Sequence, residues 1–240
     1  MVTLEGKVAL ITGAASGLGA ALTAVLLEAG MQVIMVDRQA DRLAAVRERA
    51  DPQGHRTRDL VIDLRDREAV MAAMADITGL FGGLDVLVNN AGTDVTAAID
   101  ALTLENWDDV VAVNLTAPFM LSKLALPALR ARRGQIVNIA STAAKRAWPN
   151  ASAYHASKWG LTGLSHALHA ELRADGIRVM SVVVGGMRTP FLLDRFEGLD
   201  LARLQDPGNV ARAIAFALTM PVESAIPELM VLPRQESSWP

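Results

Sequence analysis

Residues 7–19 read KVALITGAASGLG, and this stretch decides the fold. A short apolar run, Lys7–Thr12, passes through glycines at positions 13, 17 and 19 into a helical stretch, Gly17–Gly30. Glycine lets the chain turn tightly and lets backbone approach a ligand closely. The N-terminus of the following helix offers free N–H groups and a positive dipole end, which suit a pyrophosphate. The spacing is G-x-x-x-G-x-G instead of the common G-x-G-x-x-G, at the same place in a strand–turn–helix unit. The alternative is a tight strand–helix turn that binds nothing.

Short apolar runs alternate with helical stretches along the whole chain. Most runs are continuous in Val, Ile and Leu, which is typical of strands covered on both faces. Alternating strands and helices favour right-handed crossovers and a parallel sheet. We therefore predict an α/β fold, a doubly wound parallel sheet of about seven strands with helices on both faces. The expected strands are Lys7–Thr12, Gln32–Asp37, Thr57–Ile62, Leu84–Val88, Gly134–Ala140, Ile177–Val184 and Glu228–Leu232, and the expected helices are Gly17–Gly30, Ala40–Ala50, Arg67–Gly79, Leu104–Ala131, Ala153–Asp175 and Pro207–Met220, the last with Asp206 as N-cap.

Length and composition fit one domain over residues 1–240, because 51% of the 240 residues are hydrophobic and a sizeable core is possible. The 23 basic and 26 acidic residues nearly balance, which gives no basic stripe for nucleic acid. The absence of cysteine excludes disulfides, thiol nucleophiles and cysteine-ligated metals. We find no secretion signal and no apolar run of the ~18 residues that span a bilayer. We expect a cytoplasmic protein without nucleic-acid or membrane partners.

Two aspartates follow the second and third expected strands. Asp37 can hydrogen-bond a ribose diol and would repel a 2′-phosphate, which favours NAD over NADP, although Arg38 could pair with that phosphate. Asp37 could also act as N-cap of the helix Ala40–Ala50. Asp63 is a candidate for the adenine edge, with an ordinary turn aspartate as the alternative.

The single tyrosine, Tyr154, stands four residues before Lys158, so in a helix the two side chains share a face. A nearby ammonium lowers the pKa of a phenol, which can then exchange a proton with a reacting oxygen. An amphipathic helix surface is the alternative, since Tyr-x-x-x-Lys often arises by chance.

Further segments make the combination specific: Asn89-Asn90-Ala91-Gly92 after the fourth strand, Asn114 in the long helix, and Ser141 thirteen residues before Tyr154. With the glycine turn, they closely resemble the short-chain dehydrogenase/reductase family from about Lys7 to Thr189. The resemblance implies a Rossmann-like fold and an oxidoreductase that transfers a hydride between a nicotinamide cofactor and a secondary alcohol or ketone. A homodimer or homotetramer, formed through the two long helices and the last strand, is also implied.

The resemblance assigns four catalytic roles. Tyr154 would be the general acid/base, Lys158 would lower its pKa and hold the nicotinamide ribose, and Ser141 would hydrogen-bond the substrate oxygen. Asn114 would hold a water that links Lys158 to solvent. The cofactor would be bound by Gly13, Ser16, Leu18, Gly19, Asp37, Asp63, Asn90, Ala91, Gly92, Gly185 and Thr189, together with Tyr154 and Lys158. One departure concerns Val184, which stands where the family usually has proline, so the loss of a fixed φ puts the local geometry in doubt.

No metal site is expected, because the four histidines show no paired ligand spacing with carboxylates. We interpret His155 as structural, and His166 and His169 as helix surface or subunit contact.

The expected substrate pocket draws on Thr93–Thr96, Thr142–Trp148 and Gly186–Phe196, with Thr189–Asp206 as a flap. Trp148, Met187 and Phe191–Leu193 indicate an apolar side, whereas Arg146 and Arg188 could meet an anion or be solvated. Trp148 could equally be a core or interface residue. An apolar or mixed secondary alcohol or ketone fits better than a small free sugar. The alternatives are an NADPH-dependent 3-oxoacyl-thioester reductase and a catalytically silent cofactor-binding regulatory protein. Trp239 near the C-terminus could anchor at an interface or lie in a disordered tail.

Overall fold

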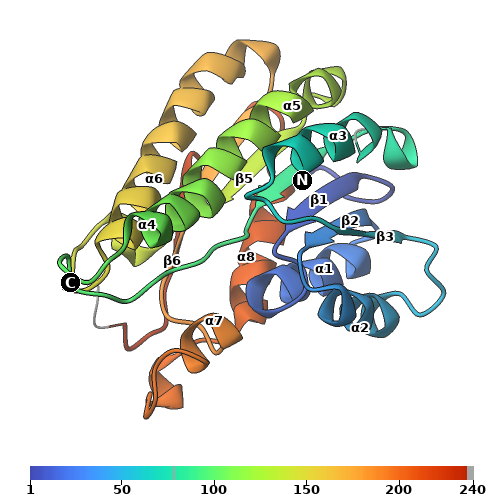
Figure 1. Ribbon diagram of the computed structural model, residues 1–240. Helices are drawn as coiled ribbons and strands as arrows, with labels where there is room; N and C mark the ends of the chain where they lie inside the picture. The colour runs from blue at the N-terminus through green and yellow to red at the C-terminus, as the bar shows by residue number, and fades with distance from the viewer. Residues whose placement is uncertain (78, 237–240) are drawn as a thin grey trace.

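An all-parallel sheet of seven strands forms the centre of the protein, in the order β3-β2-β1-β4-β5-β6-β7 (Figure 1). The structure is a computed structural model that describes residues 1–77 and 79–236. The prediction of a doubly wound parallel sheet is confirmed, and the strand ends differ from the expected ones by two residues at most. The strand order reverses between β1 and β4, which is where such sheets place a ligand, at the carboxyl ends of the strands. The strands are β1 Val8–Thr12, β2 Gln32–Asp37, β3 Thr57–Val61, β4 Val86–Asn89, β5 Gln135–Ile139, β6 Arg178–Val184 and β7 Glu228–Val231.

Helices cover both faces of the sheet. In Figure 1, α3, α5 and α6 lie on one face, and α1, α2 and α8 lie on the other. The principal helices are α1 Gly17–Glu28, α2 Ala40–Ala50, α3 Arg67–Ile77, α4 Leu104–Val111, α5 Ala117–Arg132, α6 Ser152–Leu172, α7 Pro190–Leu193 and α8 Pro207–Leu218. The predicted cap of α8 is confirmed: the Asp206 side chain accepts a hydrogen bond from the Gly208 N–H, and Pro207 occupies the first turn.

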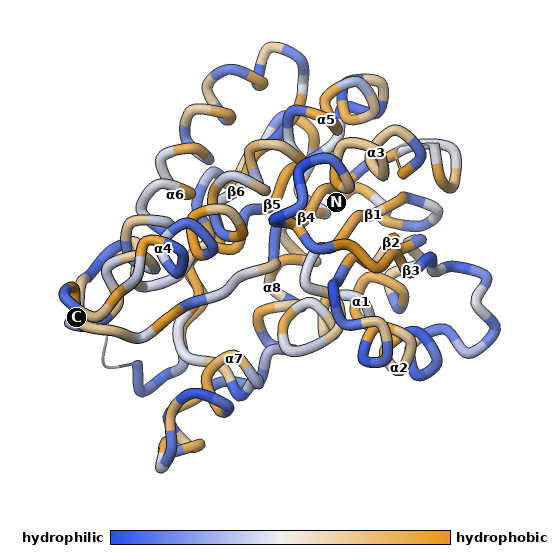
Figure 2. The backbone as a smooth tube through the Cα atoms, in the orientation of Figure 1, coloured by the Kyte–Doolittle hydropathy of each residue, from blue (hydrophilic) through white to orange (hydrophobic). Residues whose placement is uncertain are grey.

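The sheet divides the core into two apolar layers. Ala9 and Ile11 of β1 pack into the layer beneath α1 and α8, whereas Val8 and Leu10 pack into the layer beneath α3, α5 and α6. All five residues of β1 are buried, which explains why its sequence shows no polar alternation. Figure 2 shows the same pattern as hydrophobic colouring along β1 and β2, in contrast with the hydrophilic connection between α2 and β3.

The long helix expected over Leu104–Ala131 is interrupted. Residues Ala112–Thr116 form a π-helical turn between α4 and α5, with Asn114 fully buried inside it. Pro118 helps to explain this interruption, because it has no N–H to donate to the Asn114 carbonyl four residues earlier. Such π turns often occur at functional sites. The break therefore coincides with a residue that the sequence singled out.

The combined helix Leu104–Arg132 is long and apolar enough to span a bilayer by length and composition alone. The sequence reading had found no such run. In the structure this helix belongs to the layer over the sheet, where α5 contacts α3 and α4 contacts α6. Apolar helices of this kind also occur in the cores of globular proteins. The expectation for Trp239 lies outside the described residues.

The glycine turn supplies the first test of the fold. A Cβ at Gly19 would lie 2.0 Å from the Gly13 carbonyl oxygen, whereas a Cβ at Gly163, exposed on α6, would meet nothing within 4 Å. We predict that Gly19→Ala lowers the free energy of unfolding by about 2 kcal/mol or more, because backbone must move. Gly163→Ala should raise it by roughly 0.5–1 kcal/mol through helix propensity. Urea unfolding of both variants makes the comparison, and equal stabilities would contradict the close approach at Gly19.

Candidate functional site

A cavity of about 530 Å³ opens at the carboxyl ends of the strands, beside the point where the strand order reverses. This volume lies in the range of small-molecule and cofactor sites. One end is lined by the glycine turn and the ends of β2 and β3, and the other by the segments around Ser141, Tyr154 and residues 184–196. Of the site residues predicted from sequence, the cavity wall contains Gly13, Ser16, Leu18, Asp37, Asp63, Asn90, Ala91, Gly92, Ser141, Tyr154, Lys158, Gly185 and Thr189. Gly19 and Asn114 are not part of the wall.

The glycine turn has the shape of a cradle because side chains cannot occupy it. Gly13 has a φ of +66°, and a Cβ there would lie 2.8 Å from the Ala91 Cα. Gly19 packs directly on Gly13, so the close approach of these two residues shapes the turn. Ser16 is the N-cap of α1, and its side chain makes no capping hydrogen bond. The free N–H groups of α1 and the turn therefore fit a pyrophosphate.

Thr12 and Asn90 fasten the glycine turn to the end of β4. The Thr12 hydroxyl accepts hydrogen bonds from the backbone N–H groups of Asn90 and Ala91, each at 3.1 Å. The Asn90 side-chain amide donates to the carbonyls of Thr12 at 2.8 Å and Gly13 at 3.1 Å. The side chain of Asn90 thus holds the turn, which is a structural task that the sequence prediction did not assign to it.

Asp37 joins the glycine turn to the end of β2. Its Oδ2 accepts a hydrogen bond from the Ala15 N–H, and its Oδ1 accepts one from the Gln39 N–H, both at 3.0 Å. Gln39, not Asp37, is the N-cap of α2, so the helix-cap alternative was wrong. The carboxylate lies on the cavity wall beside Arg38.

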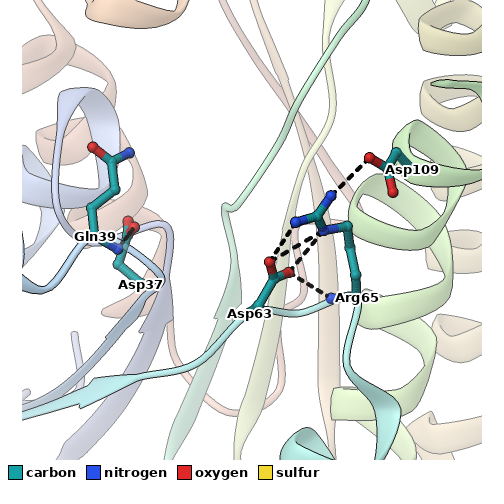
Figure 3. Close-up of polar contacts among 5 residues, drawn as sticks. All are labelled: Asp37, Gln39, Asp63, Arg65 and Asp109. Atoms are coloured by element: carbon teal, nitrogen blue, oxygen red, sulfur yellow. Dashed lines mark hydrogen bonds and ion pairs between the residues drawn. The ribbon is translucent and has the colours of Figure 1, made fainter.

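Asp63 belongs to a small charged cluster at the same end of the cavity (Figure 3). The Arg65 guanidinium bridges Asp63 at 2.7 Å and Asp109 of α4 at 2.8 Å. The hydrogen bonds from Arg65 lower the pKa of Asp63, so the carboxylate stays ionised. Figure 3 shows Asp37 and Gln39 on one side and this cluster on the other. Arg65 and Asp109 carry no sequence motif and were not predicted.

Tyr154 and Lys158 lie one turn apart on α6, and Ser141 follows β5 beside them. Burial raises the pKa of Tyr154 to about 12, and a hydrogen bond with Ser141 partly offsets this effect. The Lys158 ammonium lies 5.7 Å from the centre of the Tyr154 ring and donates to the Ile139 carbonyl at 2.8 Å. Burial lowers the pKa of Lys158 to about 8. The predicted lowering of the Tyr154 pKa by Lys158 is therefore not found here, because desolvation of the phenolate dominates.

The Asn114 side chain is fully engaged with protein groups. Its Oδ1 accepts from the Thr93 N–H at 2.8 Å, and its Nδ2 donates to the Thr93 carbonyl at 2.8 Å and the Ser157 hydroxyl at 3.0 Å. Ser157 in turn donates to the Tyr154 carbonyl at 2.8 Å. The side chain thus fixes the wall beside Gly92 to the helix that carries Tyr154. The Asn114 backbone carbonyl is the group to which the predicted water would donate. Pro118, four residues later, has no N–H to donate to that carbonyl.

His155 has the structural role that was predicted for it. Its Nδ1 lies 2.8 Å from the Ala143 carbonyl, and its Nε2 accepts from the Trp148 N–H at 3.1 Å. The Trp148 ring packs edge-on against the imidazole and also lines the cavity, with 40% of the residue exposed. The loop after Ser141 is therefore anchored to α6 from within.

Residues 189–206, which we call the flap, form the outer wall of the cavity and contain the short helix α7. Its base is closed by backbone hydrogen bonds from Gln205 to Gly186 and from Arg188 to Gln205, at 3.0 and 2.9 Å. Val184 extends β6, paired with Val231, so a regular ladder replaces the restriction that proline would impose. Thr189 lies under the glycine turn, where a Cβ at Gly17 would meet its side chain at 3.1 Å.

Sequence reasoning missed one pair across the cavity mouth. Arg195 of the flap lies 3.0 Å from Asp94, which follows β4, and both line the cavity. Both residues fall inside the predicted wall segments, but neither was singled out. Arg146 does not line the cavity, and Arg188 pairs with Asp206 and the Leu204 carbonyl instead of facing an anion site.

Within residues 1–77 and 79–236, no group of three or more His, Asp or Glu side chains is arranged to hold an ion. His166 lies 3.6 Å from Glu228 at the surface, as its predicted place on the helix exterior requires.

Comparison with known proteins agrees with this geometry. The family model for short chain dehydrogenases matches residues 7–199. The chain is 38% identical over 180 residues to D-threitol dehydrogenase of Mycolicibacterium smegmatis, covering 75% of this chain and 69% of that protein. It is 33% identical over 222 residues to the 3-oxoacyl-[acyl-carrier-protein] reductase FabG of Thermotoga maritima, covering 89% and 90%.

A solved structure is similarly close. The crystal structure of a metagenomic short-chain oxidoreductase in complex with NADP superposes with a TM-score of 0.85 at 33% identity. The match covers 96% of this chain and 98% of that one. The likeness therefore extends over nearly the whole chain.

The buried ammonium of Lys158 predicts a distinct pH dependence of stability. Its pKa is about 8 in the folded protein and 10.5 ordinarily, so between these values the unfolded state binds more protons and stability rises with pH. The unfolding free energy of the wild type minus that of Lys158→Met should increase by about 3 kcal/mol from pH 7 to 10.5. Guanidinium unfolding across this range measures it.

Lys123→Met provides the matched control, because it removes an exposed lysine on α5. Its difference from wild type should show no comparable increase. A pH-independent difference for Lys158→Met would contradict the effect of burial on Lys158.

Proposed function

The chain belongs to the short-chain dehydrogenase/reductase family, and we propose that it is an NAD-dependent oxidoreductase that interconverts a secondary alcohol and a ketone. One observation carries the proposal. Ser141, Tyr154 and Lys158 gather at one end of the same cavity whose other end is the glycine cradle. A cofactor laid along this cavity would have its pyrophosphate at the turn and its reactive end at the phenol.

The protein's share of the chemistry is to position two carbons and move one proton. When bound, the nicotinamide accepts or supplies the hydride. In oxidation, Tyr154 takes the proton of the carbinol oxygen while Ser141 hydrogen-bonds the same oxygen. In reduction, the phenol donates its proton to the carbonyl oxygen. The charge of Lys158, desolvated beside Tyr154, stabilises a phenolate through a medium of low dielectric.

The balance of charges at the adenosine end supports NAD. The carboxylates of Asp37 and Asp63 both line the cavity there, and a 2′-phosphate would lie close to them. Arg65 is already shared between Asp63 and Asp109. Arg38 remains the residue on which NADP binding would depend, and a similar structure is in complex with NADP.

Reduction of 3-oxoacyl thioesters with NADPH is the second candidate, favoured by the identity to FabG. A catalytically silent cofactor-binding protein is less well supported, because such a protein would be free to lose any of Ser141, Tyr154 and Lys158.

For the remaining properties we propose a cytoplasmic location, a small-molecule substrate and a homodimer or homotetramer. The assembly proposal draws on large apolar side chains that α5 and α6 expose, namely Phe119 at 47% and Trp159 at 53%.

Tyr154→Phe tests the acid/base role. We predict a fall in kcat of roughly 100- to 10,000-fold, because Phe has no hydroxyl that can exchange a proton with the substrate oxygen. The Kd of the cofactor, measured by quenching of tryptophan fluorescence, should stay within a few-fold of the wild-type value. Near-normal turnover in the variant would falsify the assignment.

A pH profile tests the same group independently. Because the pKa of Tyr154 is raised to about 12, the phenol is protonated at neutral pH. The rate of alcohol oxidation should rise with pH, whereas ketone reduction, which uses the protonated phenol, should not. An oxidation rate that falls with rising pH, together with a reduction rate that increases, would exclude Tyr154 as the proton-transfer group.

Asp37→Ser tests the cofactor preference. Removing the carboxylate should raise kcat/KM for NADP relative to NAD by about 10-fold or more, since the repulsion of a 2′-phosphate is lost. Asp41→Ser is the matched control, because Asp41 is exposed on α2 and does not line the cavity. A wild-type preference for NADP would overturn the argument from Asp37.

A further inference from the structure

The cavity contains a buried ion pair that the proposed reaction does not use. Asp94 Oδ2 lies 3.0 Å from Arg195 Nη1, with side-chain exposures of 8% and 22%. Asp94 follows β4, and Arg195 lies in the flap, so the pair joins opposite walls of the cavity. Charges at such depth are costly unless their hydrogen bonds are satisfied.

The hydrogen bonds of this pair are incomplete. Among the described residues, Asp94 Oδ1 and Arg195 Nη2 are buried without a hydrogen-bond partner, whereas Arg195 Nη1 faces the Asp94 carboxylate. The remaining guanidinium nitrogen, Nε, donates to the Phe191 carbonyl at 2.7 Å, and the guanidinium stacks 3.7 Å from the centre of the Phe191 ring. These contacts hold Arg195 in place and leave one buried acceptor, Asp94 Oδ1, and one buried donor nitrogen, Arg195 Nη2, without a partner.

The pair lies near the reacting group. The Phe191 ring contacts both Arg195 and Tyr154. Its centre lies 5.8 Å from the centre of the Tyr154 ring, and the two rings are tilted by 41°. The charges of Asp94 and Arg195 both act on the Tyr154 hydroxyl. A substrate held at Tyr154 would therefore extend toward this pair.

We propose that Asp94 and Arg195 form a subsite for a second, uncharged hydroxyl of the substrate. That hydroxyl would donate to Asp94 Oδ1 and accept from the N–H of Arg195 Nη2. The proposal rests on the proposed function and narrows its substrate to diols and the corresponding hydroxyketones. The second hydroxyl is a spectator: the carbinol carbon gives its hydride to the cofactor and its proton to Tyr154, and the other hydroxyl keeps both of its bonds.

Other polar groups fit the subsite less well. A substrate carboxylate would be attracted by Arg195 but would face the free oxygen of Asp94, and the two charges of the pair already offset each other. A keto or ester oxygen only accepts, so it would leave Asp94 Oδ1 unpaired in a buried position. A hydroxyl supplies both a donor and an acceptor. The expectation of a largely apolar substrate wall is thereby revised.

Substrate pairs of equal chain length make the test. Secondary alcohols are compared with diols that carry a second hydroxyl on the adjacent carbon or one or two carbons further, and with hydroxy acids. For wild type, the best diol should exceed its mono-alcohol in kcat/KM by roughly 10- to 100-fold, the worth of a hydrogen bond to a charged group. Asp94→Asn and Arg195→Gln should each reduce this diol-to-alcohol ratio at least several-fold.

Arg203→Gln is the matched control, because Arg203 pairs with Asp200 at the surface of the same flap, with its side chain 63% exposed. It should leave the ratio unchanged. If the pair only holds the flap in place, the Asp94 and Arg195 variants will lower kcat/KM for the diol and for the alcohol by the same factor. An unchanged diol-to-alcohol ratio in these variants would overturn the subsite.

The remaining outcomes separate the two proposals. Equal kcat/KM for diol and alcohol in wild type, or a preference for the hydroxy acid, would overturn the subsite and leave the oxidoreductase intact. No turnover of any alcohol, diol or corresponding ketone with either NAD or NADP would overturn the proposed function and the subsite with it.

Discussion

The fastening of β1 to β4 at their carboxyl ends is the constraint on which the rest of the site depends. At this point the strand order reverses, so the chains leaving the two strands diverge to opposite sides of the sheet and open a crevice. The side chains of Thr12 and Asn90 make four hydrogen bonds across the opening: the Thr12 hydroxyl accepts two and the Asn90 amide donates two. They also satisfy backbone groups that the diverging strands can no longer pair. Gly13 must lack a side chain there because the Ala91 backbone approaches it, so the crevice and the cradle have one cause.

A second feature is the depth at which charge is held. Lys158 is buried with a backbone carbonyl as its hydrogen-bond partner, and burial alone lowers its pKa. Tyr154 is shifted in the opposite direction by the same desolvation. Both shifts favour the neutral forms, so forming a phenolate beside an ammonium has a large free-energy cost in the protein without a ligand. A ligand that brings polar groups to Tyr154 and Lys158 would lower this cost, so proton transfer would be coupled to occupancy of the cavity.

What the sequence could predict follows from how local each signal is. The strands were predictable because β1 and its neighbours are buried on both faces and are written as unbroken apolar runs. Tyr154 and Lys158 were predictable because one helical turn relates them. The π turn at Asn114 was missed although its cause, Pro118, is present in the chain, since a helical period does not show a bulge. The raised pKa of Tyr154 was missed because burial is set by distant segments. Asp94 and Arg195 were not singled out for the same reason: they meet only when the flap folds over the end of β4.

The two walls of the cavity are built differently, and the difference assigns them different work. On the inner wall, Ser141 lies in a loop that His155 pins to α6 through Ala143 and Trp148, and Asn114 fixes the opposite edge to the same helix. The side chains proposed to handle the proton therefore share one support, as proton transfer over a fixed distance requires. The outer wall is the flap, whose base is closed by backbone hydrogen bonds and whose tie across the cavity is the Asp94–Arg195 pair. A ligand hydroxyl in the proposed subsite would complete the hydrogen bonds of the Asp94–Arg195 pair, and it would thereby also stabilise the flap against the end of β4. Substrate recognition and closure would then be the same event, and the chemistry of Tyr154 would be shielded from water only when a fitting substrate is present.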